Sequence, residues 1–238
     1  MNKETTPLYR FKTSEYIKGA ALFIVYLVLL PYIMLLVSNL MQLLTGRPIS
    51  ERALLLTPYY LSFALAALLF KNYFIDQLSV FTHHLGRSLG SMFRCYFLMY
   101  GITIVCAMVL LAIGMNSGNP NDLAVEGLVN SYDRVMLVMA VFLAPLVEEL
   151  LFRGLIFGSL YKVKPIVAYI VSWLAFGAAH LLQYAIETGD WRTMIFMIEY
   201  LPPSIAWGWC YKRSGSIWTV IFMHMIFNAM GMAVMRGL

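Results

Sequence analysis

The hydrophobic positions of this chain fall into seven long runs separated by short polar segments. A helix that crosses the hydrocarbon core of a bilayer needs about 20 mostly apolar residues, and each run is close to that length. We therefore expect membrane-spanning helices at about 17–44, 53–70, 92–113, 134–161, 166–184, 193–210 and 217–235. The pattern predicts an all-α, polytopic membrane helix bundle.

The polar segments between the runs, and the prolines within them, predict further local structure. Residues 71–94 mix charged and apolar side chains at a spacing typical of an amphipathic helix at the membrane interface. Residues 114–134 are rich in Asn, Gly and acidic residues, which predicts a loop, with 122–129 as the place for a short helix. Pro31 predicts a kink in the first span, and Pro202-Pro203 predicts an interruption of the sixth.

Composition and charge agree with a membrane protein. Of the 238 residues, 61% are hydrophobic and 12% are charged, whereas a soluble domain carries about 25% charged residues. The segments expected on the cytoplasmic side, beginning with the N-terminus, hold most of the Lys and Arg residues. The acidic loops, with Asp122 and Glu126 and with Glu187 and Asp190, fall outside. We expect a multi-pass protein of the cell membrane, with the lipid bilayer around it and no nucleic acid as a partner.

The first apolar run is too long for the hydrophobic part of a signal peptide and lacks a cleavage site, so we interpret it as a retained span. Residues 1–133 form an N-terminal part with spans one to three, the interfacial segment and an outer loop. Residues 134–238 contain spans four to seven. We expect both parts to belong to one integral membrane domain.

The fourth span carries the sequence Glu148-Glu149-x-x-x-Arg153. Charged side chains at this depth are costly and usually serve a function. Glu149 and Arg153 stand four residues apart, so they are expected to form an ion pair. Glu148 is rotated about a third of a turn away and has no such partner in sequence, which leaves it available for chemistry. Alternatively, all three residues form one structural ion-pair network.

Two further polar pairs occupy later spans. They are Phe176-x-x-x-His180, which encloses Gly177, Ala178 and Ala179, and His224-x-x-x-Asn228. The three small residues would allow a neighbouring helix to approach closely. A lone histidine in a span is more often a packing residue. Together with Glu148, however, the set predicts that Glu148, His180, His224 and Asn228 face a common polar cavity.

Two chemical schemes fit this set, and both hydrolyse a carbonyl compound that is apolar or tethered in the membrane. In the first, Glu148 is a general base for water, because desolvation disfavours its charged form, and the histidines and Asn228 hold water or stabilise an oxyanion. In the second, Glu148, His180 and His224 are three ligands of a catalytic zinc ion.

Elsewhere, adjacent His83 and His84 are interpreted as a solvated pair. Cys95, Cys106 and Cys210 are interpreted as buried free thiols.

The ordered set Glu-Glu-x-x-x-Arg, Phe-x-x-x-His and His-x-x-x-Asn resembles the CAAX protease and bacteriocin-processing family (CPBP, or Abi) of intramembrane proteases. The resemblance covers about 134–235. It implies an endopeptidase in which Glu148 and His180 activate water, and His224 and Asn228 form an oxyanion site. Glu149, Arg153 and Phe176 support these four residues, and a divalent metal such as zinc is an optional cofactor.

Eukaryotic members of this family cut prenylated CAAX tails, whereas bacterial members process peptide precursors or give bacteriocin immunity. The resemblance thus implies a membrane-associated peptide or protein as the substrate. One alternative is a non-catalytic membrane regulator or immunity protein that binds a membrane partner such as a sensor kinase. Another is a transporter, which Pro31, Pro202-Pro203 and Glu199 would suit, although no inverted repeat is visible.

Overall fold

The structure, a computed structural model, describes residues 7–115 and 118–237. Those residues form helices joined by short connections, and no strand occurs among them, which confirms the all-α prediction. The elements in chain order are α1 (Thr13–Ile24), η1 (Val25–Leu29), α2 (Leu30–Thr45), α3 (Glu51–Leu69), α4 (Lys71–His83), α5 (Leu85–Ala112), α6 (Pro120–Met136), η2 (Leu137–Leu143), α7 (Ala144–Glu148), η3 (Glu149–Phe157), α8 (Gly158–Tyr161), α9 (Pro165–Thr188), η4 (Trp191–Tyr200), α10 (Leu201–Ser214) and α11 (Ile217–Met235).

The chain is a multi-pass integral membrane protein. Within the described ranges, five helices are long and apolar enough to cross a membrane, judged by length and composition: Thr13–Thr45, Glu51–Leu69, Leu85–Ala112, Pro165–Thr188 and Ile217–Met235. The other two predicted spans take a different form. The fourth lies in an unbroken helical run from α6 to α8, and the sixth is divided between η4 and α10.

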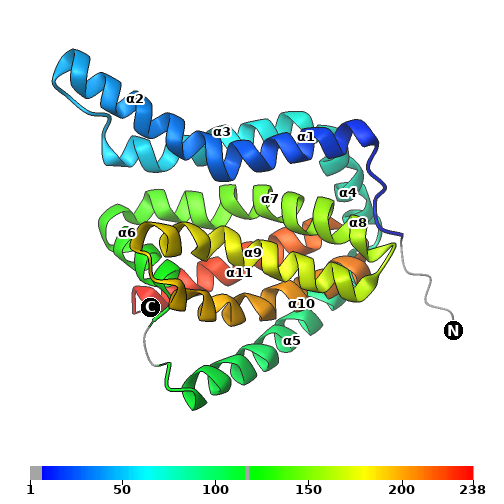
Figure 1. The fold of residues 1–238 in the computed structure, drawn as a ribbon. Coiled ribbons are helices and arrows are strands. Elements are labelled where there is room, and N and C mark those ends of the chain that lie inside the picture. The colour runs from blue at the N-terminus through cyan, green and yellow to red at the C-terminus, as the bar shows by residue number, and fades with distance from the viewer. Residues whose placement is uncertain (1–6, 116–117, 238) are drawn as a thin grey trace, which may run out of the picture.

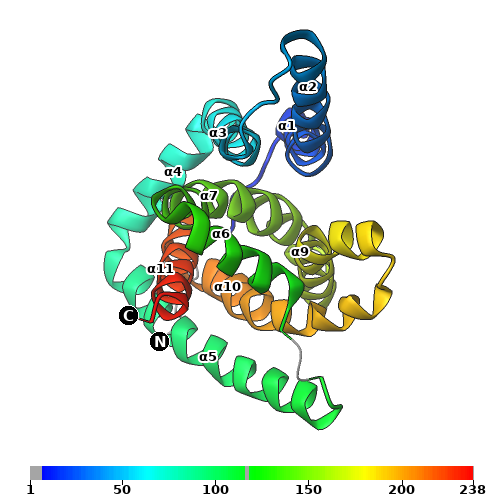
Figure 2. The same ribbon diagram turned by 90° about the vertical axis from the view of Figure 1, so that its left-hand side faces the viewer.

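The helices form layers. α1, η1 and α2 make one continuous helix that packs beside α3 as an outer layer, above the helix that contains α7 (Figure 1). In the turned view, α10 and α11 lie below α7 (Figure 2). α5 lies at the bottom of this view, on the side of the bundle away from α2 and α3. We call α1, η1, α2 and α3 the N-terminal layer. The described chain begins near α4 and α8 and ends beside α6, at opposite ends of the bundle (Figure 1).

One hydrophobic core joins both halves of the sequence. Leu22 of the N-terminal layer and Cys95 of α5 are buried in the same cluster as Phe152, Trp207 and Val220. The helices that follow residue 134 therefore depend on the earlier ones for their packing.

At each end of the bundle, a polar contact joins two segments that the distribution of charged residues predicts to lie on the same side of the membrane. Lys162 Nζ donates to the Tyr9 carbonyl at 2.6 Å, which connects two segments predicted to be cytoplasmic. Asn119 Nδ2 donates to Glu199 Oε2 at 2.7 Å, within the half of the bundle predicted to face outward.

The prediction of a mostly non-helical segment at 114–134 was wrong. The segment predicted as a loop with a short helix at 122–129 is helical from Pro120 to Met136. Its start is favourable because Asn119 Oδ1 accepts from the Asn121 N–H at 3.0 Å and Pro120 occupies the first helical position. The sixth predicted span does change at Pro202-Pro203. The 3₁₀ segment η4 ends at Tyr200, and the two prolines lie in the first turn of α10, where proline is tolerated.

Residues 71–94, predicted as one interfacial helix, are divided: 71–83 form α4 and 85–94 belong to α5. The interfacial location stays a prediction. α4 also caps the start of α11. Gln77 Oε1 accepts from the Ile217 N–H at 2.9 Å, and the Gln77 carbonyl accepts from Ser216 Oγ at 2.6 Å. His83 and His84, at the other end of α4, are exposed, as the sequence predicts.

We predict that Gln77→Ala lowers the free energy of unfolding by about 1–3 kcal/mol, because it leaves the buried Ile217 N–H without its acceptor. Denaturant or thermal unfolding of the purified protein in detergent measures this change. His84→Ala, at an exposed position just beyond α4, is the control and should change stability by no more than about 0.5 kcal/mol. Equal stability of the two variants would contradict the capping role of Gln77.

Candidate active site

The charged motif lies where the helical run changes from α-helix to π-helix. Glu148 is the last residue of α7 and Glu149 is the first residue of the π-helical segment η3. Glu148 is 6% exposed, and Glu149 and Arg153 are 0% exposed. A second π segment, η2, precedes α7, and Pro145 stands in the first turn of α7. Segments of π-helix are frequent at functional sites.

The predicted ion pair is confirmed. Arg153 Nη1 donates to Glu149 Oε1 at 3.1 Å, and His224 Nδ1 lies 2.8 Å from the same oxygen. The Arg153 guanidinium also stacks 4.2 Å above the ring of Phe176 and 4.9 Å from that of Trp207. A buried cation is thus held by one carboxylate and two aromatic faces.

The Glu149 contact fixes the orientation of His224. An ionised carboxylate can only accept hydrogen bonds, so the proton of this bond lies on His224 Nδ1. The opposite ring nitrogen, Nε2, is 3.8 Å from Glu148 Oε2. His224 therefore stands between the two glutamates, bound to one and facing the other.

Glu148 shares His224 with Glu149 but binds Tyr26 instead of Arg153. Its Oε1 accepts from the Tyr26 hydroxyl at 3.0 Å, and its Oε2 faces His224. Tyr26 belongs to η1 in the N-terminal layer, far from the three motifs in sequence. Nothing in the sequence singles out this residue, because one tyrosine in an apolar span carries no motif. Pro31, shortly after η1, was the nearest local signal.

Phe176 connects the two histidines. Its ring lies 4.6 Å from the ring of His180 and 6.2 Å from that of His224. His180 Nδ1 is 2.8 Å from the Phe176 carbonyl, which can only accept, so Nδ1 carries the proton and Nε2 is left as an acceptor. The small residues of this segment act as predicted at Gly177, where a Cβ atom would lie 3.1 Å from Met197 Cε of η4.

Asn228 binds backbone rather than a motif side chain. Its Nδ2 donates to the Ala140 carbonyl, in η2, at 2.7 Å. In the π pattern, the N–H of residue 145 would bond the carbonyl five residues earlier, which is that of Ala140. Pro145 has no N–H, and Asn228 supplies the missing donor. Asn228 thus braces the helix that carries Glu148, and its oxyanion role stays a prediction.

The structure brings Glu148, Glu149, Arg153, Phe176 and His224 into one cluster, to which His180 is joined through the Phe176 ring. The zinc scheme requires Glu148, His180 and His224 around one point. In the described part of the chain, no group of three or more His, Cys, Asp and Glu side chains is placed to hold a metal ion. We therefore derive no step through a metal, and the zinc ligand set stays a prediction.

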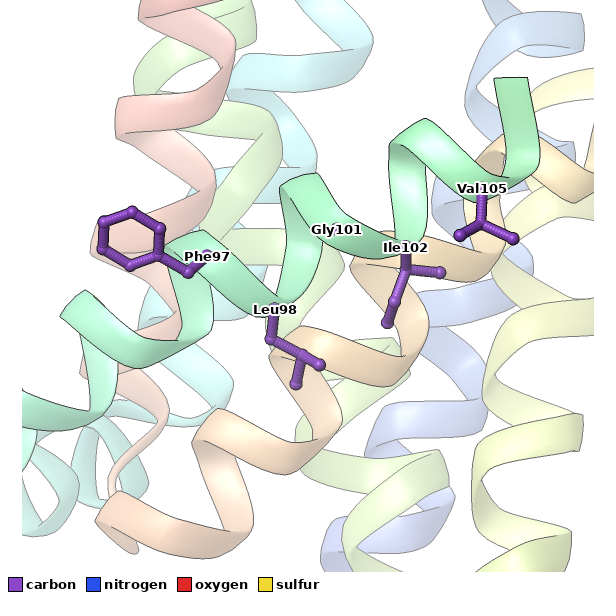
Figure 3. Close-up of a pocket in the computed structure, with 5 residues that line it drawn as sticks. All are labelled: Phe97, Leu98, Gly101, Ile102 and Val105. Carbon is purple, nitrogen blue, oxygen red and sulfur yellow. The ribbon is translucent and has the colours of Figure 1, made fainter. Parts of the chain in front are cut away.

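A separate apolar pocket of about 410 Å³ lies along α5 (Figure 3). Its lining residues are Phe97, Leu98, Gly101, Ile102 and Val105. None of them carries a titratable group, so this pocket offers no chemistry comparable to that of the motif cluster.

Comparison with known proteins agrees with this cluster. Residues 130–230 match the model of the family described as "Type II CAAX prenyl endopeptidase Rce1-like". The chain is 27% identical over 95 residues to the Bacillus subtilis (strain 168) protein described as "Putative membrane peptidase YdiL". That match covers 40% of this chain and 34% of the relative, so it spans about a third of the relative's length. No solved structure gives a significant match. The predicted resemblance to the CAAX protease family is confirmed.

We predict that Glu149→Gln lowers stability by about 3–5 kcal/mol, because it leaves the buried Arg153 guanidinium without its carboxylate. Thermal unfolding and membrane accumulation measure the loss, and Glu126→Gln at an exposed position of α6 is the control. The double variant Glu149→Leu, Arg153→Met should lose less stability than Glu149→Leu and Arg153→Met lose together as single variants, since it buries no isolated charge. If the stability losses of the single variants simply add in the double variant, the two residues are not coupled.

Asn228→Asp keeps the shape of the side chain but removes the donor to the Ala140 carbonyl. We predict a stability loss of about 1–3 kcal/mol from this change, measured by unfolding in detergent. The matched control is Asn72→Asp at an exposed position of α4. If Asn228→Asp unfolds like the wild type, the bracing role is wrong.

Proposed function

We propose that this chain, whose residues 130–230 resemble CAAX prenyl endopeptidases, is an intramembrane endopeptidase that hydrolyses a membrane-associated peptide or protein. One observation carries the proposal: Glu148 is buried but does not share the Glu149–Arg153 ion pair. It faces His224 and is held by Tyr26 instead. A carboxylate that is not consumed by an ion pair is free to move protons.

Glu148 acts as the general base in this proposal. It accepts a proton from a water molecule as the water oxygen attacks the carbonyl carbon of the scissile peptide bond. When the C–N bond breaks, the protonated Glu148 returns that proton to the leaving nitrogen. His180, whose Nε2 is an acceptor, assists by orienting the water.

His224 stabilises the negative charge that develops on the carbonyl oxygen. In this role His224 donates from Nε2, the ring nitrogen that faces Glu148 Oε2 at 3.8 Å. The contact of Nδ1 with Glu149 fixes the ring, so a donor at Nε2 would stand beside the general base, where the oxyanion forms.

The surroundings of the site select the substrate class. The cluster is enclosed by apolar helices that cross the membrane, so a water-soluble peptide would have to leave water to reach it. A peptide or protein that is already inserted in the bilayer, or anchored to it, does not meet that cost.

We predict that Glu148→Gln lowers hydrolysis by about 10²–10⁴-fold, because the amide cannot accept the proton from water. Mass spectrometry of membrane and secreted peptides from cells that express each variant measures this loss and identifies the substrate. Glu126→Gln, exposed on α6, is the control. Unlike Glu149→Gln, Glu148→Gln should leave thermal stability near that of the wild type, because it breaks no ion pair with Arg153.

Full cleavage by Glu148→Gln would show that Glu148 is not the base. If the peptides are the same in the wild type and in Glu148→Gln, and Glu148→Gln still binds a membrane partner, the non-catalytic regulator is favoured instead.

A further inference from the structure

We infer that Tyr26 is a positioning residue for Glu148, so that the N-terminal layer completes a site whose motifs all lie in the later helices. This inference rests on the proposed function, because it assigns Tyr26 a role in catalysis through Glu148. The observation behind it is the bond from the Tyr26 hydroxyl to Glu148 Oε1 at 3.0 Å, between residues 122 positions apart.

The bond orients the carboxylate. A glutamate side chain has three rotatable bonds, and an unrestrained carboxylate exchanges its two oxygens by rotation about the last of them. With Oε1 held by the phenol, Oε2 is the oxygen that faces His224 Nε2 at 3.8 Å. Among the described residues, Tyr26 makes the hydrogen bond that the Glu148 side chain accepts.

The local backbone of the first helix places the phenol. Tyr26 lies in η1, a π-helical segment that ends two residues before Pro31. The ring of that proline would clash with the carbonyl four residues earlier in a regular helix, and the wider π turn relieves such crowding. The ring of Tyr59, on α3, packs edge-on against the ring of Tyr26, with 6.1 Å between the ring centres. Tyr59 thus holds the Tyr26 ring from the neighbouring helix of the N-terminal layer.

Tyr26 lies outside residues 130–230, the part of the chain that matches the family model. The N-terminal layer is therefore more than a membrane anchor. It contributes one functional group to the catalytic cluster, and the later helices alone leave Glu148 without this donor.

Tyr26→Phe tests the inference, because it removes the hydroxyl and keeps the ring that packs on Tyr59. Tyr32→Phe is the matched control: it makes the same chemical change in the same continuous helix, at a side chain that is 67% exposed. Both full-length variants are reconstituted in lipid vesicles. The assay substrate is a quenched fluorescent peptide built on the precursor that the Glu148→Gln comparison identifies.

We expect Tyr26→Phe to lower kcat about tenfold, which corresponds to about 1.4 kcal/mol, while KM stays within about twofold. A second readout does not depend on cleavage. The infrared carboxylate band that disappears in Glu148→Gln should shift in Tyr26→Phe and stay in place in Tyr32→Phe. Thermal unfolding should occur at a modestly lower temperature in Tyr26→Phe, because buried Glu148 Oε1 loses its donor, and should be unchanged in Tyr32→Phe.

A wild-type kcat and an unshifted band in Tyr26→Phe would overturn the inference, as would equal effects of the two phenylalanine variants. If the band shifts in Tyr26→Phe but the wild-type protein cleaves no peptide, the contact is real and the proposed function is wrong. The infrared readout therefore separates failure of the inference from failure of the proposed function.

Discussion

A guanidinium enclosed by membrane-spanning helices needs a negative partner, and the arrangement of this bundle follows from how Arg153 obtains one. Glu149 supplies the charge from the same helix, and the rings of Phe176 and Trp207 enclose the cation from α9 and α10. Glu149 then has lone pairs left for His224 of α11. Four helical segments thus meet around one cation, and Glu148 is held beside that meeting point without belonging to the ion pair.

Backbone irregularity has a comparable organising effect. Pro145 leaves the Ala140 carbonyl without its helical donor, and Asn228 donates to it from α11. A carbonyl left unpaired in an apolar core costs several kcal/mol, so such a bond is needed wherever the helical pattern fails. The same helix, α11, therefore satisfies both the charge on Glu149 and the backbone before Glu148. His224 and Asn228 lie one turn apart on α11, and both bind the helical run that carries Glu148.

The sequence was most informative where the interacting residues are near each other in the chain. The spacing of Glu149 and Arg153 predicted their ion pair, and the small residue Gly177 predicted close packing of a neighbouring helix. Contacts between distant segments could not be read from spacing. Nothing about Tyr26 distinguishes it from other aromatic residues in apolar spans until the fold places it against Glu148. Pro202-Pro203 could be placed at a change in the sixth span, but not the form of that change, which is a 3₁₀ segment running directly into an α-helix.

The order in which the chain is made has a consequence for the Glu148 contacts. Tyr26 is synthesised long before Glu148, and the imidazole that binds Glu149 follows that residue by 75 positions. While α11 is still in the ribosome or the translocon, Glu149 has only Arg153, and Glu148 faces no histidine from that helix. The nascent protein can thus enter the bilayer with Glu149 and Arg153 already paired within one helix. The contacts of the motif cluster are complete only when α11 has been inserted beside them.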